Sequence, residues 1–305
     1  MSNFYNKAGI LTTFSSLWLC YSLALEIRFL IYMQDSTQQA VIGSGWSWVH
    51  PWRILLRLPF LLLHLFIGLP LLYLTINRFG RSINVGSRTL DEFMQSWWTN
   101  SLCLIFGIRR KIIGTLGPGP LFVVANHVSF LDIVLLGSIT QMSFVSKAEI
   151  ANWPLVGTIA RMGDTVFHHR GSGNSLQAVI DAISTKILEG KRVAVFPEGR
   201  IYCGDKVHRF HARLFQVAIE ENINVQPICI RYLQKGKLNP RICLCDRNER
   251  FFWNAIRLLG EAGSIAELRV QAIITPTGKS RRELAESAHF AVAEAYPDRE
   301  DHNED

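Results

Sequence analysis

The chain has 305 residues, of which 49% are hydrophobic and 19% charged, and it carries a formal net charge of +7 at pH 7. The length allows one large domain with extensions or two modest domains, and the apolar content favours membrane contact. The positive charge indicates an anionic partner. Nucleic acid is disfavoured because no recognisable binding motif is present and the basic residues are spread along the chain, which leaves anionic lipid as the better candidate.

The six cysteines are scattered, and most lie in apolar surroundings, as expected of small core residues in a reducing compartment. Cys243 and Cys245 have the wrong spacing for a zinc knuckle, and no second pair exists. Adjacent histidines His168 and His169 point to opposite faces of a strand, so they would not ligate one ion together. The sequence therefore predicts no metal site.

Residues 58–76 are almost entirely apolar. Nineteen residues at the helical rise span about 28 Å, close to the hydrocarbon thickness of a bilayer. His64 is the only ionisable residue in this stretch, and arginines flank it on both sides. The pattern predicts a membrane helix; the alternative is a buried or interface-lying helix pair.

A second apolar stretch, residues 8–25, is followed by Glu26 and Arg28, which weaken it as a clean span. The link at 35–51 contains no Lys or Arg, whereas Arg78, Arg81 and Arg88 follow the 58–76 stretch. The positive-inside rule then puts the link outside and the rest of the chain on the cytoplasmic face of the inner membrane. We expect residues 1–80 to form a membrane-embedded helical hairpin or interfacial anchor, and 298–305 to be a frayed tail.

Short apolar runs alternate with amphipathic stretches from residue 119 onward. Strands are predicted at 121–125, 142–146, 165–168, 192–196, 225–232 and 268–274, with helices at 130–139, 150–161, 174–188, 209–221 and 281–295. This alternation predicts an α/β fold, with a largely parallel mixed sheet flanked by helices, over residues 81–297; the motif core is 119–235.

Polar residues follow four of the predicted strands. His127 follows the first, Lys147 the second, Arg170 the third, and Glu198, Gly199 and Arg200 the fourth. Because open α/β sheets bind ligands beyond the carboxyl ends of their strands, these residues are expected at one edge of the sheet.

His127 and Asp132 are candidates for a base and its orienting carboxylate. An imidazole paired with a carboxylate can take a proton from an alcohol at neutral pH. The competing explanation for Asp132 is a capping box with Ser129, and the two roles can coexist.

Two further segments offer cations. Arg170, at the end of 163–170, could bind phosphate, or could pair with a surface carboxylate. In the segment 196–200, Pro197 stops strand pairing and Gly199 permits close approach of the backbone to a ligand, unless the segment is only a turn.

These segments together resemble the membrane-bound glycerolipid acyltransferases typified by 1-acyl-sn-glycerol-3-phosphate acyltransferase, over 121–232. The blocks that carry the likeness are 126–132, 147–157, 163–170, 196–199 and 225–228. The resemblance implies catalytic roles for His127 and Asp132. It implies substrate-binding roles for Lys147, Arg170, Glu198, Gly199 and Arg200, and an acyl-side position for Val225 and Pro227.

The implied reaction moves a fatty acyl group from acyl-CoA or acyl-carrier protein, with no other cofactor, to a lysophospholipid hydroxyl. The first candidate acceptor is 1-acyl-sn-glycerol-3-phosphate, giving phosphatidic acid. The chain departs from the family where Arg200 directly follows Gly199, and residues 204–216 are more similar to the lyso-ornithine-lipid branch. Acylation of lyso-ornithine lipid or another lysolipid is therefore the alternative, ahead of a lipid hydrolase or a non-catalytic lipid-binding membrane protein.

Overall fold

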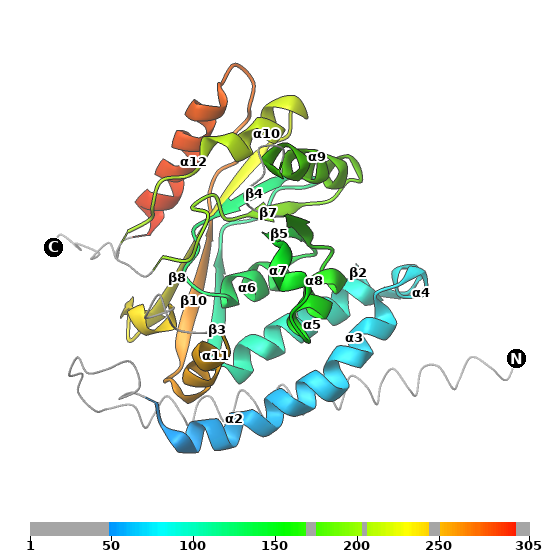
Figure 1. Ribbon diagram of the computed structural model, residues 1–305, viewed down its shortest axis with the longest axis vertical. Helices are drawn as coiled ribbons and strands as arrows, with labels where there is room; N and C mark the ends of the chain where they lie inside the picture. Colours follow the sequence, from blue (N-terminus) through cyan, green and yellow to red (C-terminus); the bar gives the residue numbers. More distant parts are fainter. Residues whose placement is uncertain (1–48, 169–174, 203–205, 244–250, 297–305) are drawn as a thin grey trace, which may run out of the picture.

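The structure of the protein is a computed structural model that describes residues 49–168, 175–202, 206–243 and 251–296 (Figure 1). Several predictions lie outside these ranges: the earlier apolar stretch at 8–25, most of the link at 35–51, the position of Arg170, and the tail at 298–305.

A mixed sheet forms the centre of the molecule (Figure 1), with the strand order β3, β10, β8, β4, β7, β5, β6, and with β9 paired to β8. Strands β8, β4, β7, β5 and β6 are mutually parallel, whereas β10 is antiparallel to β8 and parallel to β3. The strand bounds are β3 (Ile108–Ile113), β4 (Phe122–Ala125), β5 (Ser143–Lys147), β6 (Val166–His168), β7 (Val193–Val195), β8 (Val225–Gln234), β9 (Lys237–Leu238) and β10 (Ser264–Val270). The predicted α/β class with a largely parallel sheet is confirmed.

Helices cover both faces of the sheet (Figure 1). Along the chain, the path runs from β4 through β5 to β6 at one edge of the sheet and then returns through β7 to β8. Connections between parallel strands are right-handed as a rule, so a reversal of direction in the sheet moves the connecting helices to the other face. Helices of the outward path therefore lie on one face and those of the return path on the other. The first set is α6 (Leu131–Ile139), α7 (Ala148–Ala151) and α8 (Val156–Met162); the second is α9 (Ser175–Leu188), η2 (Ala212–Phe215) and α10 (Gln216–Glu220).

Two longer helices add to these layers. Helix α5 (Leu90–Ile105) packs on α6, and α12 (Arg281–Ala295) packs on η2 and β8. Both begin with a capping box, Thr89 with Glu92 and Ser280 with Glu283. The remaining elements are α4 (Arg78–Ser82), η3 (Pro240–Ile242), α11 (Phe251–Gly260) and the hairpin of β1 (Asn84–Val85) with β2 (Arg88–Thr89).

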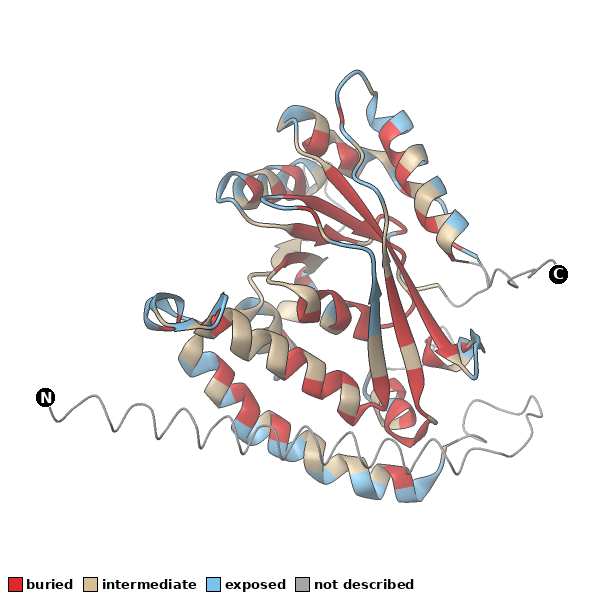
Figure 2. Ribbon diagram, turned by 180° about the vertical axis from the view of Figure 1, so that it is seen from behind, coloured by how far each residue is buried: buried red, intermediate tan, exposed pale blue. Residues whose placement is uncertain are grey.

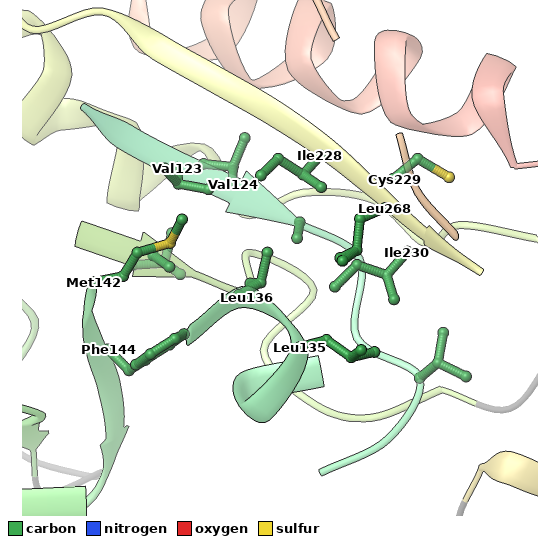
Figure 3. Packing of buried hydrophobic residues seen from close by; sticks show 14 of the residues in the cluster. Val123, Val124, Leu135, Leu136, Met142, Phe144, Ile228, Cys229, Ile230 and Leu268 are labelled. Atoms are coloured by element: carbon green, nitrogen blue, oxygen red, sulfur yellow. The ribbon is translucent and has the colours of Figure 1, made fainter. Parts of the chain in front are cut away.

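The hydrophobic core lies where the sheet meets its helices (Figure 2). All residues of β4 and β7 are buried, as expected of central parallel strands covered on both faces. Figure 3 shows Leu135 and Leu136 of α6 directed at the sheet, near Phe144 of β5 and Ile230 of β8. This packing fixes the start of α6 against the end of β4.

The long helix at the N-terminal side consists of α2 (Pro51–Leu63), η1 (His64–Gly68) and α3 (Leu69–Thr75). It contains the predicted apolar stretch, and over the described residues it is the one helix long and apolar enough to cross a membrane. Its outward face carries exposed apolar side chains, including Leu55 and Phe66, whereas Leu69 and Leu72 pack inward.

Arginines near the start of this helix have an internal role. Arg57 Nη1 donates hydrogen bonds to the carbonyl oxygens of Leu259 and Glu261, each at 2.9 Å, and Arg53 Nη1 donates to the carbonyl of Gly260. These carbonyls end α11, where a cation is favourable because helical C-terminal carbonyls lack intrahelical partners. The long helix is therefore attached to the α/β layers by specific bonds as well as by apolar packing.

Two elements have other bounds in the structure than the sequence predicts. The helix predicted at 209–221 is reduced to η2 and α10, because the backbone amides of His208 and His211 bond to Glu198 and Pro197 instead of to a preceding turn. The strand predicted at 268–274 is β10, which begins at Ser264. Its start was missed because Glu267 interrupts the apolar run, although that side chain is buried in an ion pair with Arg231.

Candidate active site

His127 and Asp132 are hydrogen-bonded at the carboxyl end of β4. The His127 Nδ1 atom lies 2.8 Å from Asp132 Oδ2, with the histidine side chain 14% exposed and the aspartate side chain fully buried. His127 is the second residue after β4, and Asp132 lies in the first turn of α6. The strand-to-helix connection therefore brings together the two groups that the sequence singles out.

The Asp132 carboxylate is held by further donors. Its Oδ2 accepts hydrogen bonds from the backbone amides of Val128 and Ser129 at 2.6 and 2.9 Å, and its Oδ1 accepts from the Tyr232 hydroxyl at 2.6 Å. Ser129 Oγ lies 3.4 Å from the amide of Leu131. The carboxylate thus reaches back to the loop, as a capping residue does, while it also holds the imidazole.

The His127 ring is fixed on its other sides as well. It stacks on Phe196 with 4.0 Å between ring centroids and an interplanar angle of 13°. The preceding Asn126 side chain exchanges two hydrogen bonds, each 2.8 Å, with the backbone of Ile230 in β8. Because Nδ1 is bonded to Asp132, Nε2 is the ring nitrogen left for chemistry.

Glu198 fastens the loop of His127 to a second loop. Its Oε2 accepts a hydrogen bond from the His127 amide and its Oε1 from the His208 amide, both at 2.7 Å. Burial raises the pKa of this carboxyl to about 7, although the two amide bonds act in the opposite direction. Both carboxylate oxygens accept hydrogen bonds from the main chain, so Glu198 links the loop of His127 to the loop of His208.

Gly199 and Arg200 form the outer side of the same turn. Gly199 has a φ of 77°, and a Cβ added there would lie 3.3 Å from the His211 ring, so glycine fits this position best. The Arg200 guanidinium lies 4.4 Å from the Tyr202 ring centroid, and Tyr202 stacks on His208. The Arg200 guanidinium is therefore held by a cation–π contact with the Tyr202 ring.

A cavity of about 2040 Å³ opens beside His127. Its apolar wall includes Leu69 and Leu72 of α3 and Trp98 of α5, and its cationic wall includes Lys147 and Arg200. The imidazole therefore lies between a surface suited to a hydrocarbon chain and one suited to anionic groups.

Comparison with known proteins agrees with this geometry. The family model described as Acyltransferase matches residues 109–231. The lyso-ornithine lipid O-acyltransferase of Pseudomonas aeruginosa is 33% identical over 203 residues, which cover 67% of this chain and 78% of that protein. The chain belongs to the acyltransferase family. It is an O-acyltransferase of the group that includes the lysophospholipid acyltransferases.

Two further matches of this acyltransferase are one by sequence and one by fold. The 1-acyl-sn-glycerol-3-phosphate acyltransferase of Neisseria gonorrhoeae is 35% identical over 130 residues, covering 42% of this chain and 51% of that protein. The crystal structure of the 1-acyl-sn-glycerophosphate acyltransferase PlsC from Thermotoga maritima superposes with a TM-score of 0.58 at 19% identity, covering 80% of this chain and 93% of that one. The second comparison bears on the fold alone.

The structure of the acyltransferase brings most of the expected site residues to one sheet edge. His127, Lys147, Gly199 and Arg200 line the cavity, with Asp132 and Glu198 behind them. Arg170 lies outside the described residues. The predicted acyl-side residues Val225 and Pro227 are buried in β8, in register with Phe122 and Val124, and the cavity lining does not include them.

Tyr232 was not anticipated as a site residue. It lies near the carboxyl end of β8, the strand next to β4, so the strand-end rule that selected the other residues could also have selected it. Phe196, which stacks on His127, was expected at the end of a strand and in the block 196–199, without a role of its own at the site.

Proposed function

We propose that this acyltransferase moves a fatty acyl group from a thioester donor to the free hydroxyl of a lysolipid, with His127 as the general base. The observation that carries the proposal is the 2.8 Å bond between His127 Nδ1 and Asp132 Oδ2, at a histidine that lines a cavity with both apolar and cationic walls. Binding alone needs no oriented base, which disfavours a non-catalytic lipid-binding protein.

In the proposed mechanism, His127 Nε2 removes the proton from the acceptor hydroxyl as its oxygen attacks the thioester carbonyl. Asp132 holds the ring and stabilises the imidazolium that forms. The tetrahedral intermediate breaks its carbon–sulfur bond, and the imidazolium returns the proton to the departing thiolate. The acyl group passes directly between substrates, because the thioester already supplies a good leaving group, and no cofactor beyond the donor is used.

The first candidate acceptor is 1-acyl-sn-glycerol-3-phosphate, giving phosphatidic acid. Lys147 and Arg200 line the cavity and would bind the phosphate, with Arg170 as a third candidate cation. Glu198 would support headgroup binding indirectly, since both of its oxygens bond to backbone amides.

Lyso-ornithine lipid is the second candidate acceptor. One observation favours it: the relative matched over 78% of its own length bears the name lyso-ornithine lipid O-acyltransferase. This lipid contains no phosphate, so the contribution of Lys147 and Arg200 to acceptor binding would differ between the two acceptors.

We place the enzyme on the cytoplasmic face of the inner membrane, with acyl-CoA or acyl-carrier protein as the donor. The cation-free link at 35–51 and the arginines after residue 77 support this orientation through the positive-inside rule. The apolar outward face of the long helix supports membrane attachment.

The test is transfer by the purified protein from labelled acyl-CoA and acyl-carrier protein to a panel of lysolipids that includes both candidates. His127→Ala should lower kcat by at least about a hundredfold, the usual contribution of a general base. His50→Ala, at an exposed histidine outside the cavity, is the matched control and should leave kcat unchanged.

A labelled diacyl product from the wild type supports the proposal. Release of labelled free fatty acid in the presence of every acceptor would indicate a hydrolase instead. Full activity of His127→Ala would remove the histidine from its assigned role.

A further inference from the structure

Four arginines form a second cationic region of the cavity wall, separate from Lys147 and Arg200 at the strand ends. We propose that this arginine cluster, Arg209, Arg213, Arg281 and Arg282, binds the phosphate groups on the carrier portion of the acyl donor. The proposal rests on the proposed function and extends it, because it assigns a place to the part of the donor that does not react.

The cluster is exposed and carries excess positive charge. All four arginines line the cavity, and all are solvent-exposed. Arg282 forms an exposed ion pair with Glu286 at 3.7 Å, whereas no ion pair involving the other three occurs within the described residues. Guanidinium groups that line a cavity and exceed the carboxylates paired with them are suited to phosphate, which they bind bidentately and with full charge.

The cluster is built from two elements that pack together. Arg213 lies in η2 and Arg281 begins α12, and these two elements are in contact. Arg209 and Arg282 also share a smaller adjoining cavity of about 310 Å³, so they are close neighbours. The segment before η2 is further held by the T-shaped contact between Phe210 and His289 of α12.

The same segment is tied to the catalytic turn. The His211 amide donates a hydrogen bond to the Pro197 carbonyl at 2.9 Å, and the His211 ring packs against Gly199. The Tyr202 amide donates to the His127 carbonyl at 3.0 Å. The segment that carries Arg209 and Arg213 is therefore joined to the catalytic turn by hydrogen bonds, while the four arginines remain distinct from the reacting groups.

The position of the cluster favours the donor over the acceptor. Elements η2 and α12 lie on the return-path face of the sheet, opposite the face covered by α6 (Figure 1). The apolar cavity wall from α3 and α5 belongs to the other side, where a membrane lipid would enter. Coenzyme A and acyl-carrier protein are both water-soluble anions whose phosphates are separated from the thioester by a long pantetheine arm. A phosphate site remote from the lipid side matches that chemistry.

The test compares Arg209→Ala/Arg281→Ala with Lys235→Ala/Lys237→Ala, which removes the same charge at exposed positions outside the cavity lining. Michaelis constants are measured in the full chain for palmitoyl-CoA and for palmitoylated acyl-carrier protein, and separately for the acceptor. The arginine variant should raise the KM of at least one donor by about tenfold, the effect of losing roughly 1.4 kcal/mol of binding. Its kcat and acceptor KM should stay within about twofold, since the lost contacts are the same in ground and transition states.

A second readout is the salt dependence of donor binding, followed by equilibrium binding of palmitoyl-CoA and of the carrier protein without turnover. The wild type should lose donor affinity more steeply with added salt than the arginine variant does.

An effect limited to palmitoyl-CoA identifies coenzyme A as the source of the phosphates, and one limited to the carrier protein identifies that donor. Unchanged affinity for both donors, or a rise in the acceptor KM instead, would overturn the proposal. If the wild-type protein transfers no acyl group at all, the proposed function is wrong. If the wild type is active and the arginine variant binds both donors as the wild type does, only the assignment of the arginine cluster is wrong.

Discussion

Asp132 receives hydrogen bonds from the His127 ring, the amides of Val128 and Ser129, and the Tyr232 hydroxyl. The amides come from the loop that carries His127, whereas the hydroxyl comes from β8, about a hundred residues further along the chain. Burial and the neighbouring Asp132 charge hold the pKa of Tyr232 well above its usual range, so the hydroxyl keeps its proton and remains a donor. Tyr232 therefore acts as a positioning residue for the histidine through the aspartate.

Replacing Tyr232 by phenylalanine should lower kcat by about tenfold with little change in KM, because the orientation of His127 matters most as charge develops on its ring. Without the hydroxyl, the Asp132 carboxylate loses the donor that holds its Oδ1 atom, so the imidazole bonded to Oδ2 is less precisely placed. The measurement is kcat and the acceptor KM of both proteins.

Tyr296→Phe is the control, because Tyr296 is also a buried tyrosine but its hydroxyl is not bonded to Asp132. Thermal unfolding of both variants separates a structural effect from a positioning effect. A purely structural role would lower the melting temperature of Tyr232→Phe while leaving its kcat at the wild-type value at temperatures where the variant is folded.

Among the elements, those built from uninterrupted apolar runs were predictable from the sequence, and so was the sheet edge that carries the site. Strands β4, β7 and β8 and helices α6 and α12 agree with the expected ranges to within about two residues at most boundaries, as their apolar patterns are local properties. The strand-end rule then places His127, Lys147 and Glu198 at one edge without any knowledge of tertiary contacts.

Elements that depend on distant partners were not predictable in this way. Glu267 in β10 accepts hydrogen bonds from Lys111 of β3 at 2.9 Å and from Arg231 of β8 at 2.9 Å. A glutamate within an apolar run of the sequence argues against a buried strand. Only the tertiary structure shows that cationic side chains from neighbouring strands pair with it. The hydrogen bonds of Glu198 to the backbone could not be predicted for the same reason, since the amides of His127 and His208 lie 71 and 10 residues away in the sequence.

The carboxylate of Glu267 should stabilise the junction of β3, β10 and β8 in a pH-dependent manner. Burial opposes its ionisation, but bonds from Lys111 and Arg231 prevail and lower its pKa to about 2 from 4.5. Because the folded-state pKa is depressed, this stabilisation is fully present above pH 4.5 and is lost as the pH falls through 2. Glu267→Gln should reduce the free energy of unfolding by about 3 kcal/mol at pH 7, since it removes a buried negative charge that lies 2.9 Å from the Arg231 guanidinium. Denaturant unfolding in detergent at several pH values measures the difference.

Glu286→Gln provides the comparison, because Glu286 pairs with Arg282 on the exposed surface at 3.7 Å. An exposed pair of this kind contributes less than about 1 kcal/mol. If the two glutamine variants were equally stable, or if the Glu267 difference persisted unchanged down to pH 3, the three-strand ion network would not stabilise the sheet as described.

At the scale of the whole molecule, the long helix connects two surfaces. Its outward side presents Leu55 and Phe66, which are 73% and 76% exposed, while Leu69 and Leu72 at its inner side line the cavity next to α5. Exposed apolar side chains in such a continuous row are typical of contact with lipid. A lipid beside this helix would therefore lie next to the apolar entrance of the cavity, and its headgroup would remain near the cationic wall.

This arrangement predicts where the protein touches the membrane. The photoreactive residue p-benzoylphenylalanine, placed at Phe66 in the full chain and irradiated in vesicles, should crosslink to lipid acyl chains. The same residue at Leu188 of α9 is the matched control, because Leu188 is 74% exposed but lies on the opposite face of the sheet. Mass spectrometry of the adducts should show several-fold more lipid attached at position 66, because only apolar side chains immersed in the bilayer lie next to acyl chains. Equal labelling at the two positions, or labelling at 188 alone, would mean that the helix is not the membrane-facing side and that the lipid reaches His127 by another route.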